Sequence, residues 1–392
     1  MTKDHIFQDD LQARITKVQD AIKEMGMDAC LLRVDVHIFY LTGLVFNGYY
    51  YLPAEGKPYW FVKRPNNLTG EHIVMIRKPE QIAEFLQAKG ISFPQYLLLE
   101  TDEMAYNECI RLQMMFQMPV IGNATTLMRQ IRMIKTPWEI AQLRLSAQKH
   151  AEAYAKIPSC YRTGMTDIEF QIEIERQMRL QGSIGVFHVF GPNMNIFMGS
   201  VLAGSNAGAA SPFDFALGGN GQTPLCPVGA NGALLKEGMA VMIDMAGNFT
   251  PYLTDMTRVF SIGKIPNIAR RAHQVALDIE EEMMQLACPG FSCAELYHKA
   301  LARVEKEGLT DYFMGTVQQA KFIGHGIGLQ INELPVFSAR SKEVLLPNMV
   351  VALEPKFVIP EVGAVGIENT FLVTETGVEK LTLFEQEIIP LC

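Results

Sequence analysis

The chain has 392 residues, of which 48% are hydrophobic and 19% charged, with 34 Lys and Arg against 42 Asp and Glu. That length exceeds what one hydrophobic core usually fills, so two domains are expected, and the apolar content excludes a disordered chain. The net charge of −8 argues against nucleic acid or an anionic membrane as the main partner, because both attract basic surfaces.

Cysteine usage and the N-terminal segment predict a cytoplasmic protein. The seven Cys residues form no CxxC pair, and their odd number suits reduced thiols better than a disulfide framework. The first residues are charged and lack the apolar stretch of a signal peptide. No apolar run approaches the length of about 18 residues that a membrane span needs.

Helical and strand patterns alternate in the first third of the chain, which predicts an α/β domain over residues 1–130. Hydrophobic residues recur at spacings of three and four over 8–25, as on one face of a helix, and a second helix is expected at 79–90. Strands are expected at 28–34, 58–63 and 96–100.

A domain boundary is expected between residues 120 and 140, because a clearly marked helix begins there. Thr136 can cap this helix, Pro137 suits its first position, and Glu139 completes a capping box. The second domain is therefore expected to cover residues 131–392.

The second domain mixes helical and β-type segments, so the expected fold class of the whole chain is α+β. Helices are expected at 136–157, 166–181, 268–287 and 292–307. Short β-type runs are expected at 240–247, 258–263, 350–358 and 366–377. Residues 182–235 are rich in Gly, Ala, Ser, Pro and Asn, which suits loops and short strands around a cleft.

Three acidic residues, Asp244, Glu354 and Glu368, lie in apolar β-type runs, where burial of an unpaired carboxylate is costly. Asp255 follows Asp244 by eleven residues. A turn at residues 247–248 between antiparallel strands would point both carboxylates to one site.

Each of these residues also has a structural explanation: a turn, a cap or a salt bridge. His325, in a Gly-rich segment that lets a ligand approach the ring, could equally be a surface residue. However, few basic residues stand near the carboxylates in the sequence, whereas two shared divalent cations would balance all four charges. Oxygen ligands with one imidazole suit Mn²⁺, Fe²⁺, Co²⁺ or Zn²⁺, and two such ions activate a bridging water and polarise a carbonyl.

The order of these residues resembles the "pita-bread" metallopeptidases, the family of methionine aminopeptidase, aminopeptidase P, prolidase and creatinase. The resemblance lies in the segments IDMAG, YLTDMTR, GHGIG, LEP and GIENT, which contain Asp244, Asp255, His325, Glu354 and Glu368. It extends from about Arg132 to the C-terminus. It implies a creatinase/prolidase-type α/β N-terminal domain followed by a pita-bread catalytic domain.

The resemblance also implies a role for each residue. Asp244 would be a terminal ligand of one metal ion, His325 and Glu354 terminal ligands of the other, and Asp255 and Glu368 would bridge two divalent ions (Mn²⁺, Co²⁺, Fe²⁺ or Zn²⁺). Glu354 and His325 would be the catalytic residues, with Glu354 moving the proton from water to the leaving amine. Because relatives with this N-terminal domain are often dimers, a homodimer is expected.

The sequence departs from the proline-specific members of the family at the accessory histidines that hold the substrate. Phe213, Lys321 and Asn332 stand where those histidines would be, and His188 is a candidate substitute, although it could equally be a packed strand residue. Gly366 replaces an Arg that often precedes the last bridging Glu. These differences put Xaa-Pro specificity in doubt.

The function expected from the sequence is a dinuclear metal-dependent hydrolase that cleaves a peptide or amide C–N bond, of the Xaa-Pro dipeptidase or aminopeptidase type. One alternative is a creatinase-like amidohydrolase acting on a small non-peptide metabolite. Another is a catalytically weak pita-bread protein that binds a partner. The substrate is expected to be a small peptide or amide.

Overall fold

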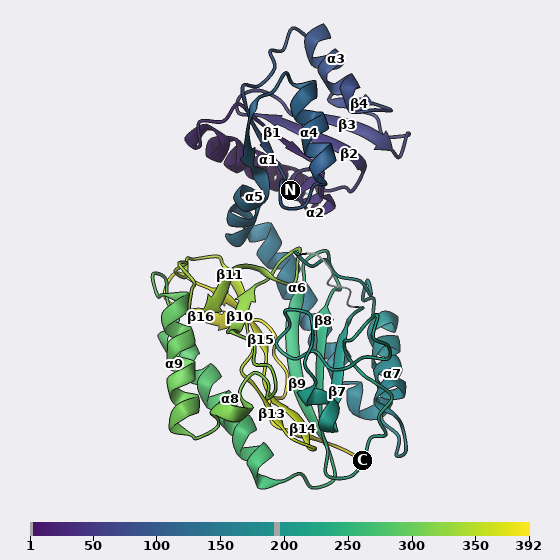
Figure 1. The fold of residues 1–392 in the computed structure, drawn as a ribbon, viewed down its shortest axis with the longest axis vertical. Helices are drawn as coiled ribbons and strands as arrows, with labels where there is room; N and C mark the ends of the chain where they lie inside the picture. Colours follow the sequence, from purple (N-terminus) through teal and green to yellow (C-terminus); the bar gives the residue numbers. More distant parts are fainter. Residues whose placement is uncertain (1–2, 192–196) are drawn as a thin grey trace. The chain divides into compact units, whose positions relative to one another are not determined.

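A computed structural model describes residues 3–191 and 197–392 of the protein. The chain divides into two compact units, Met1–Arg132 and Met133–Cys392 (Figure 1). The division falls inside the interval from residue 120 to 140. None of the helices in the described chain is long and apolar enough to cross a membrane.

The N-terminal unit is built on a mixed six-stranded sheet with the strand order β4-β3-β2-β1-β5-β6. Strand β1 lies in the middle and is buried throughout, paired antiparallel to β2 and parallel to β5. The strands are β1 (Ala29–Leu32), β2 (Asn47–Pro53), β3 (Tyr59–Arg64), β4 (Ile73–Met75), β5 (Tyr96–Leu99) and β6 (Val120–Asn123). The helices are α1 (Lys3–Glu24), α2 (Asp35–Thr42), α3 (Glu80–Ala88), α4 (Tyr106–Met115) and α5 (Ala124–Met133).

The C-terminal unit contains a four-stranded sheet in the order β17-β9-β8-β7 and a five-stranded sheet in the order β11-β10-β12-β15-β16. The hairpin β13-β14 forms a further two-stranded sheet. The strands are β7 (Gly199–Ala203), β8 (Ala240–Gly247), β9 (Thr254–Ile262), β10 (Phe322–Gly326), β11 (Glu333–Ser338), β12 (Val350–Leu353), β13 (Lys356–Ile359), β14 (Gly363–Gly366), β15 (Asn369–Val373), β16 (Val378–Lys380) and β17 (Ile389–Leu391).

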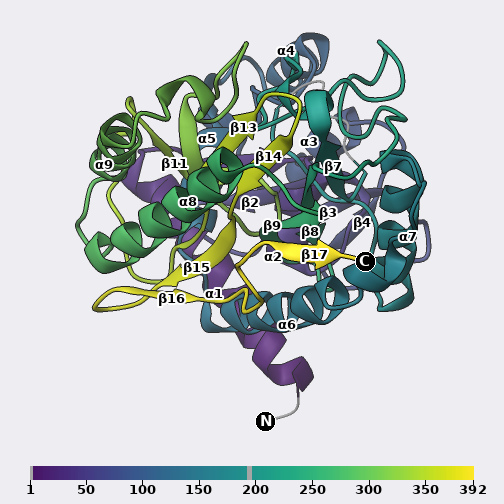
Figure 2. The same ribbon diagram turned by 90° about the horizontal axis from the view of Figure 1, so that it is seen from below.

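Helices cover the two larger sheets from opposite sides (Figure 1). Residues of α6 and α7 form one hydrophobic core with β7, β8 and β9, and residues of α8 and α9 form another with β10, β12 and β15. Figure 2 shows the C-terminal strand β17 at the edge of the sheet that contains β8 and β9, where it pairs with β9. The helices are α6 (Pro137–Tyr154), α7 (Asp167–Leu180), α8 (Asn267–Leu286) and α9 (Cys293–Lys306). The expected α+β class is confirmed.

Helix α6 begins where the sequence predicts, because its capping box forms. The Thr136 hydroxyl accepts a hydrogen bond from the Glu139 main-chain N–H at 3.2 Å, and the Glu139 carboxylate accepts one from the Thr136 N–H at 2.8 Å. Two groups that a helix start leaves without partners are thus satisfied.

The hairpin β8-β9 differs from the tight turn that the sequence suggests. Gly247 is the last residue of β8, paired with Thr254, and the connection comprises residues 248–253. A side chain at 247 has no room, because an added Cβ would lie 2.4 Å from both His150 Nδ1 and Thr254 Oγ1. Gly247 is therefore required for close packing of α6 against the hairpin and not for the turn.

Gly247→Ala should lower the free energy of unfolding by about 1–3 kcal/mol, as overpacking in a buried site does. Urea unfolding measures this change. Gly377→Ala is the matched control, because its added Cβ would meet its nearest neighbour only at 3.9 Å. Equal stability of the two variants would contradict the close-packing explanation.

Candidate active site

Asp244 and Asp255 lie on one face of the hairpin β8-β9. The antiparallel register pairs Asp244 with Thr257 and Asp255 with Ala246. Because alternate residues of a strand share a face and paired residues lie on the same side, Asp244, Asp255 and Thr257 all point to one side of the sheet. Thr257 uses this position to donate a hydrogen bond to Glu368 Oε2 at 2.8 Å.

Glu354 and Glu368 stand side by side where two hairpins meet. Strand β12 ends at Leu353, which is paired with Asn369 of β15, and β13 begins at Lys356, which is paired with Gly366 of β14. The apolar run 350–358 is thus two strands broken at Glu354 and Pro355, and not the single strand that the sequence suggests. Glu354 and Glu368 occupy the breaks, and both are almost fully buried.

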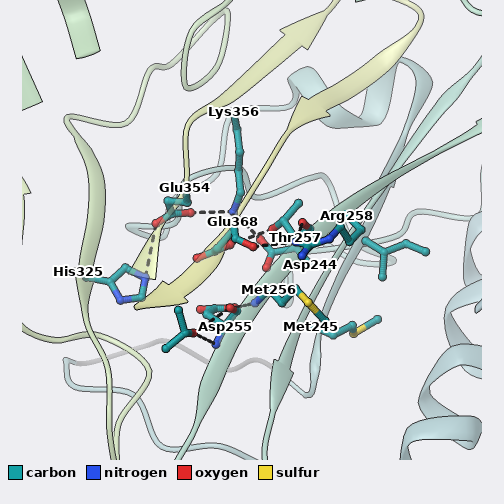
Figure 3. A network of polar contacts seen from close by, with 12 residues as sticks. Asp244, Met245, Asp255, Met256, Thr257, Arg258, His325, Glu354, Lys356 and Glu368 are labelled. Atoms are coloured by element: carbon teal, nitrogen blue, oxygen red, sulfur yellow. Dashed lines mark hydrogen bonds and ion pairs between the residues drawn. The ribbon is translucent and has the colours of Figure 1, made fainter. Parts of the chain in front are cut away.

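The structure brings all five predicted ligand residues into one cluster (Figure 3). His325, on β10, lies with its Nε2 3.5 Å from Glu354 Oε1. Its Nδ1 is 3.1 Å from the Gly326 carbonyl. Only a protonated Nδ1 can donate to that carbonyl, so the neutral ring presents an unprotonated Nε2 to the cluster.

The centre of the cluster holds a residue that the sequence analysis overlooked, Lys356. Its ammonium donates to Asp244 Oδ2 at 2.9 Å, Glu354 Oε2 at 2.7 Å and Glu368 Oε2 at 2.8 Å. A lysine ammonium has three N–H donors, and these three carboxylates take all of them. The expected scarcity of basic residues near the carboxylates is therefore wrong, because Lys356 is two residues from Glu354 and contacts it.

Gly366 makes room for this lysine. Its backbone φ of +144° suits glycine, and an added Cβ would lie 2.4 Å from the Pro355 carbonyl and 3.3 Å from Lys356 Cγ. The arginine expected at this position in related sequences is therefore incompatible with this backbone and with the neighbouring lysine.

The charges of the cluster are only partly balanced. Burial raises the pKa of Asp255 well above its ordinary value, and the Glu368 charge raises it further. Burial and the Glu354 carboxylate raise the pKa of Glu368 to about 8. In contrast, burial acts to raise the pKa of Glu354, but the Lys356 ammonium outweighs it and lowers the pKa to about 2. Ionisation is therefore least favourable at Asp255 and Glu368, where no positive charge offsets burial as fully as Lys356 does at Glu354.

Asp255, His325 and Glu368 fit a divalent cation. Each offers one ligand atom, and these three atoms lie within 4.8 Å of one another. Glu368 Oε1 is buried and has no hydrogen-bond partner among the described residues, so it is left available for a cation. Two carboxylate oxygens and one imidazole nitrogen suit a first-row transition metal.

The four predicted substrate-binding residues lie in two different places. Phe213 and Lys321 both line a pocket of about 380 Å³ beside β10. Phe322 lines the same pocket, and its ring centroid lies 6.5 Å from that of His325.

Asn332 and His188 do not line this pocket. The Asn332 side chain accepts from the Phe190 N–H and donates to the Phe190 carbonyl, each at 2.8 Å, so it anchors the loop containing Phe190. The side chain of His188 is exposed, and its carbonyl accepts a hydrogen bond from the Ile331 N–H at 2.9 Å.

Buried Arg258 positions the main chain of Glu368. The N–H groups of its guanidinium donate to the carbonyls of Thr257, Glu368, Phe384 and Glu385 and to Asn369 Oδ1, at distances from 2.6 to 3.2 Å. Arginine has five such donors, so all are satisfied. Burial lowers the pKa of Arg258 to about 10, which leaves it charged at neutral pH.

Arg258→Lys should lower the free energy of unfolding by about 3 kcal/mol, because lysine supplies three donors for five buried acceptors. Urea unfolding gives the change. The matched variant Arg270→Lys, on the exposed face of α8, should alter stability by less than about 0.5 kcal/mol. Unchanged unfolding of Arg258→Lys would show that these hydrogen bonds do not hold the Glu368 segment.

Comparison with known proteins supports this architecture. Residues 141–375 match the model of metallopeptidase family M24, and residues 14–134 match that of the creatinase/prolidase N-terminal domain. The Xaa-Pro dipeptidase of Pyrococcus furiosus is 23% identical over 389 residues, which cover 97% of this chain and 100% of that protein.

Two solved structures share the fold. The Xaa-Pro dipeptidase from Bacillus anthracis superposes with a TM-score of 0.81 at 24% identity, over 97% of this chain and 100% of that chain. The X-Pro aminopeptidase from Thermotoga maritima gives a TM-score of 0.79 at 21% identity, over 96% and 99%. The family model spans more than half of the chain. This protein is therefore a hydrolase of metallopeptidase family M24 with a creatinase/prolidase N-terminal domain.

Proposed function

We propose that the protein is a metal-dependent hydrolase that cleaves the C–N bond of a small peptide or amide, as a dipeptidase or aminopeptidase does. The observation that carries this proposal is the convergence of Asp255, His325 and Glu368 on one position, with a buried oxygen of Glu368 left without a partner. Membership of family M24 supports it, as do the relatives described as Xaa-Pro dipeptidases.

A divalent cation held by Asp255, His325 and Glu368, with Glu354 beside them, would activate a water molecule and polarise the substrate carbonyl. Mn²⁺, Co²⁺, Fe²⁺ and Zn²⁺ all suit this donor set. The carboxylate of Glu354 is ionised at neutral pH and lies next to His325, so it is our candidate for accepting the proton and passing it to the leaving amine.

The pocket beside β10 suits a small substrate with an apolar side chain and a free carboxylate. Phe213, Phe215 and Phe322 supply apolar walls, and the exposed Lys321 supplies a positive charge. Its volume of about 380 Å³ lies in the range of small-molecule sites. Neither Phe213 nor Lys321 can replace an imidazole as a hydrogen-bonding partner that takes and gives a proton near neutral pH.

The proposal is tested by loading the protein with Mn²⁺ or Co²⁺ and assaying Xaa-Pro dipeptides, other dipeptides and small cyclic amides. We expect metal-dependent turnover that is weaker on Xaa-Pro substrates than on another small amide. Absence of turnover across the whole screen at full metal occupancy would favour a partner-binding protein instead. A homodimer is also expected, and sedimentation would measure it.

Glu354→Gln should reduce turnover at least about 100-fold, the usual scale for loss of a general acid–base residue. Metal content must be measured on the same sample, because Glu354 borders the cation position. Glu375→Gln, an exposed change in the turn after β15, serves as the control and should be fully active. Retained activity of Glu354→Gln would assign the proton transfer to another group.

Lys321→Met should raise KM for dipeptides with a free C-terminal carboxylate about 5-fold, the effect of losing about 1 kcal/mol from an exposed charge contact. The corresponding dipeptide amides should be unaffected, because they have no carboxylate to pair. Lys342→Met is the matched exposed control. An equal change in KM for acids and amides would contradict recognition of a carboxylate by Lys321.

A further inference from the structure

We propose that the Lys356 ammonium permanently takes the place of one of two metal ions, so that this protein holds a single divalent cation. The inference rests on the proposed function only in assuming a cation at Asp255, His325 and Glu368. What it adds is the number of ions that the protein binds and the role of Lys356 in determining that number.

The Lys356 ammonium lies where the first metal ion would lie. Two of the carboxylates that would hold the first metal ion, those of Asp244 and Glu368, accept hydrogen bonds from Lys356 Nζ instead. The third hydrogen bond goes to Glu354 Oε2. A cation bound to these same oxygens, at metal–oxygen distances of about 2.0–2.2 Å, would coincide with the ammonium. The residues therefore do not fit two metal ions.

The Lys356 side chain is buried in the cluster, with only 1% of its surface exposed. Its backbone begins β13 and is paired with Gly366, and the Met314 N–H donates to its carbonyl at 2.8 Å. Removal of the ammonium from the cluster would take one hydrogen-bond donor from each of three carboxylates.

The carboxylates of the cluster carry more negative charge than Lys356 can balance. Four buried or partly buried carboxylates face the cluster, and Lys356 neutralises one negative charge. One divalent cation would leave a single negative charge, whereas a second would make the buried cluster positive. A second cation would also share the oxygens that Lys356 already holds, and two positive groups at that separation repel each other.

The Glu368 carboxylate is shared by the ammonium and the proposed cation position. Glu368 Oε2 accepts from Lys356 and Thr257, while its buried Oε1 has no hydrogen-bond partner among the described residues. Glu368 thus bridges the ammonium on one side and the position formed with Asp255 and His325 on the other. Of the two cation positions, the Lys356 ammonium fills one, and the position formed with Asp255 and His325 is left for a metal ion.

The test counts ions and does not depend on activity. The full-length protein is incubated with excess Mn²⁺ or Co²⁺, separated from free metal by gel filtration, and analysed by mass spectrometry. We expect one ion per chain for the wild type and close to two for Lys356→Ala. Lys135→Ala is the matched control, since Lys135 is also 1% exposed and is paired with Glu333 outside the cluster. It should still hold one ion.

Two ions or none in the wild type would overturn the inference, and so would one ion in both the wild type and Lys356→Ala. Asp244→Asn tests it independently should Lys356→Ala fail to fold. Asp244 contacts the ammonium and not the cation position, so this variant should still hold one ion, whereas Asp255→Asn should lose it. Loss of an ion from Asp244→Asn would contradict the inference. A wild type with one ion but no hydrolytic activity would refute the proposed function and leave this inference standing.

Discussion

The arrangement of the catalytic unit depends on one buried ammonium that is shared by three carboxylates. Asp244, Glu354 and Glu368 come from strands or strand breaks far apart in the sequence, and Lys356 contacts all three. Without it, four carboxylates would repel one another in a site that excludes most water, where such repulsion is strong. The positive charge of Lys356 reduces this repulsion, as a bound cation would. It therefore allows the hairpin β8-β9 to lie against the ends of β12 and β15.

The guanidinium of Arg258 also stabilises the place where the hairpin β8-β9 meets the ends of β12 and β15. Lys356 contacts the carboxylates on the cluster side, whereas Arg258 contacts the main-chain carbonyls of Thr257 and Glu368 on the opposite side of the chain. The two side chains suit different hydrogen-bond acceptors. A compact ammonium suits three convergent carboxylates, and a planar guanidinium with five donors suits a ring of carbonyls. The position of Glu368 is thus determined by its main chain and its side chain together.

The sequence predicts what depends on local signals and misses what depends on register. The capping residue Thr136 places the start of α6 correctly, because a cap acts within one helical turn. The helix expected at 166–181 begins at Asp167, where Thr166 forms a capping box with Glu169. Helix α2 was missed, since it is buried on most sides and shows no amphipathic period. The break at Pro355 had a visible signal in the proline itself.

Lys356 was missed although a signal existed. In an extended segment, residues two apart share a face, so a lysine two positions after Glu354 is directed to the same site. The pairing of Lys356 with Gly366, which leaves room for the lysine, could not be read from the sequence, because it depends on the register of β13 and β14. The same holds for the five acceptors of Arg258, which come from both sides of the β9–β15 junction and from the C-terminal segment.

Replacement of a metal ion by the Lys356 ammonium, as proposed above, would change which residues must do the chemistry. A second metal ion can bind water and a substrate oxygen, but the three N–H groups of Lys356 are all donated to carboxylates and leave none for a substrate. With a single cation, Glu354 would be the group of this chain that moves the proton. Orientation of the substrate would then depend on groups outside the cluster. Phe213 and Lys321 line the pocket next to His325 and are suited to that task. The proposed single-ion cluster and the apolar lining of this pocket thus lead to the same expectation: substrate specificity would depend on the walls of the pocket.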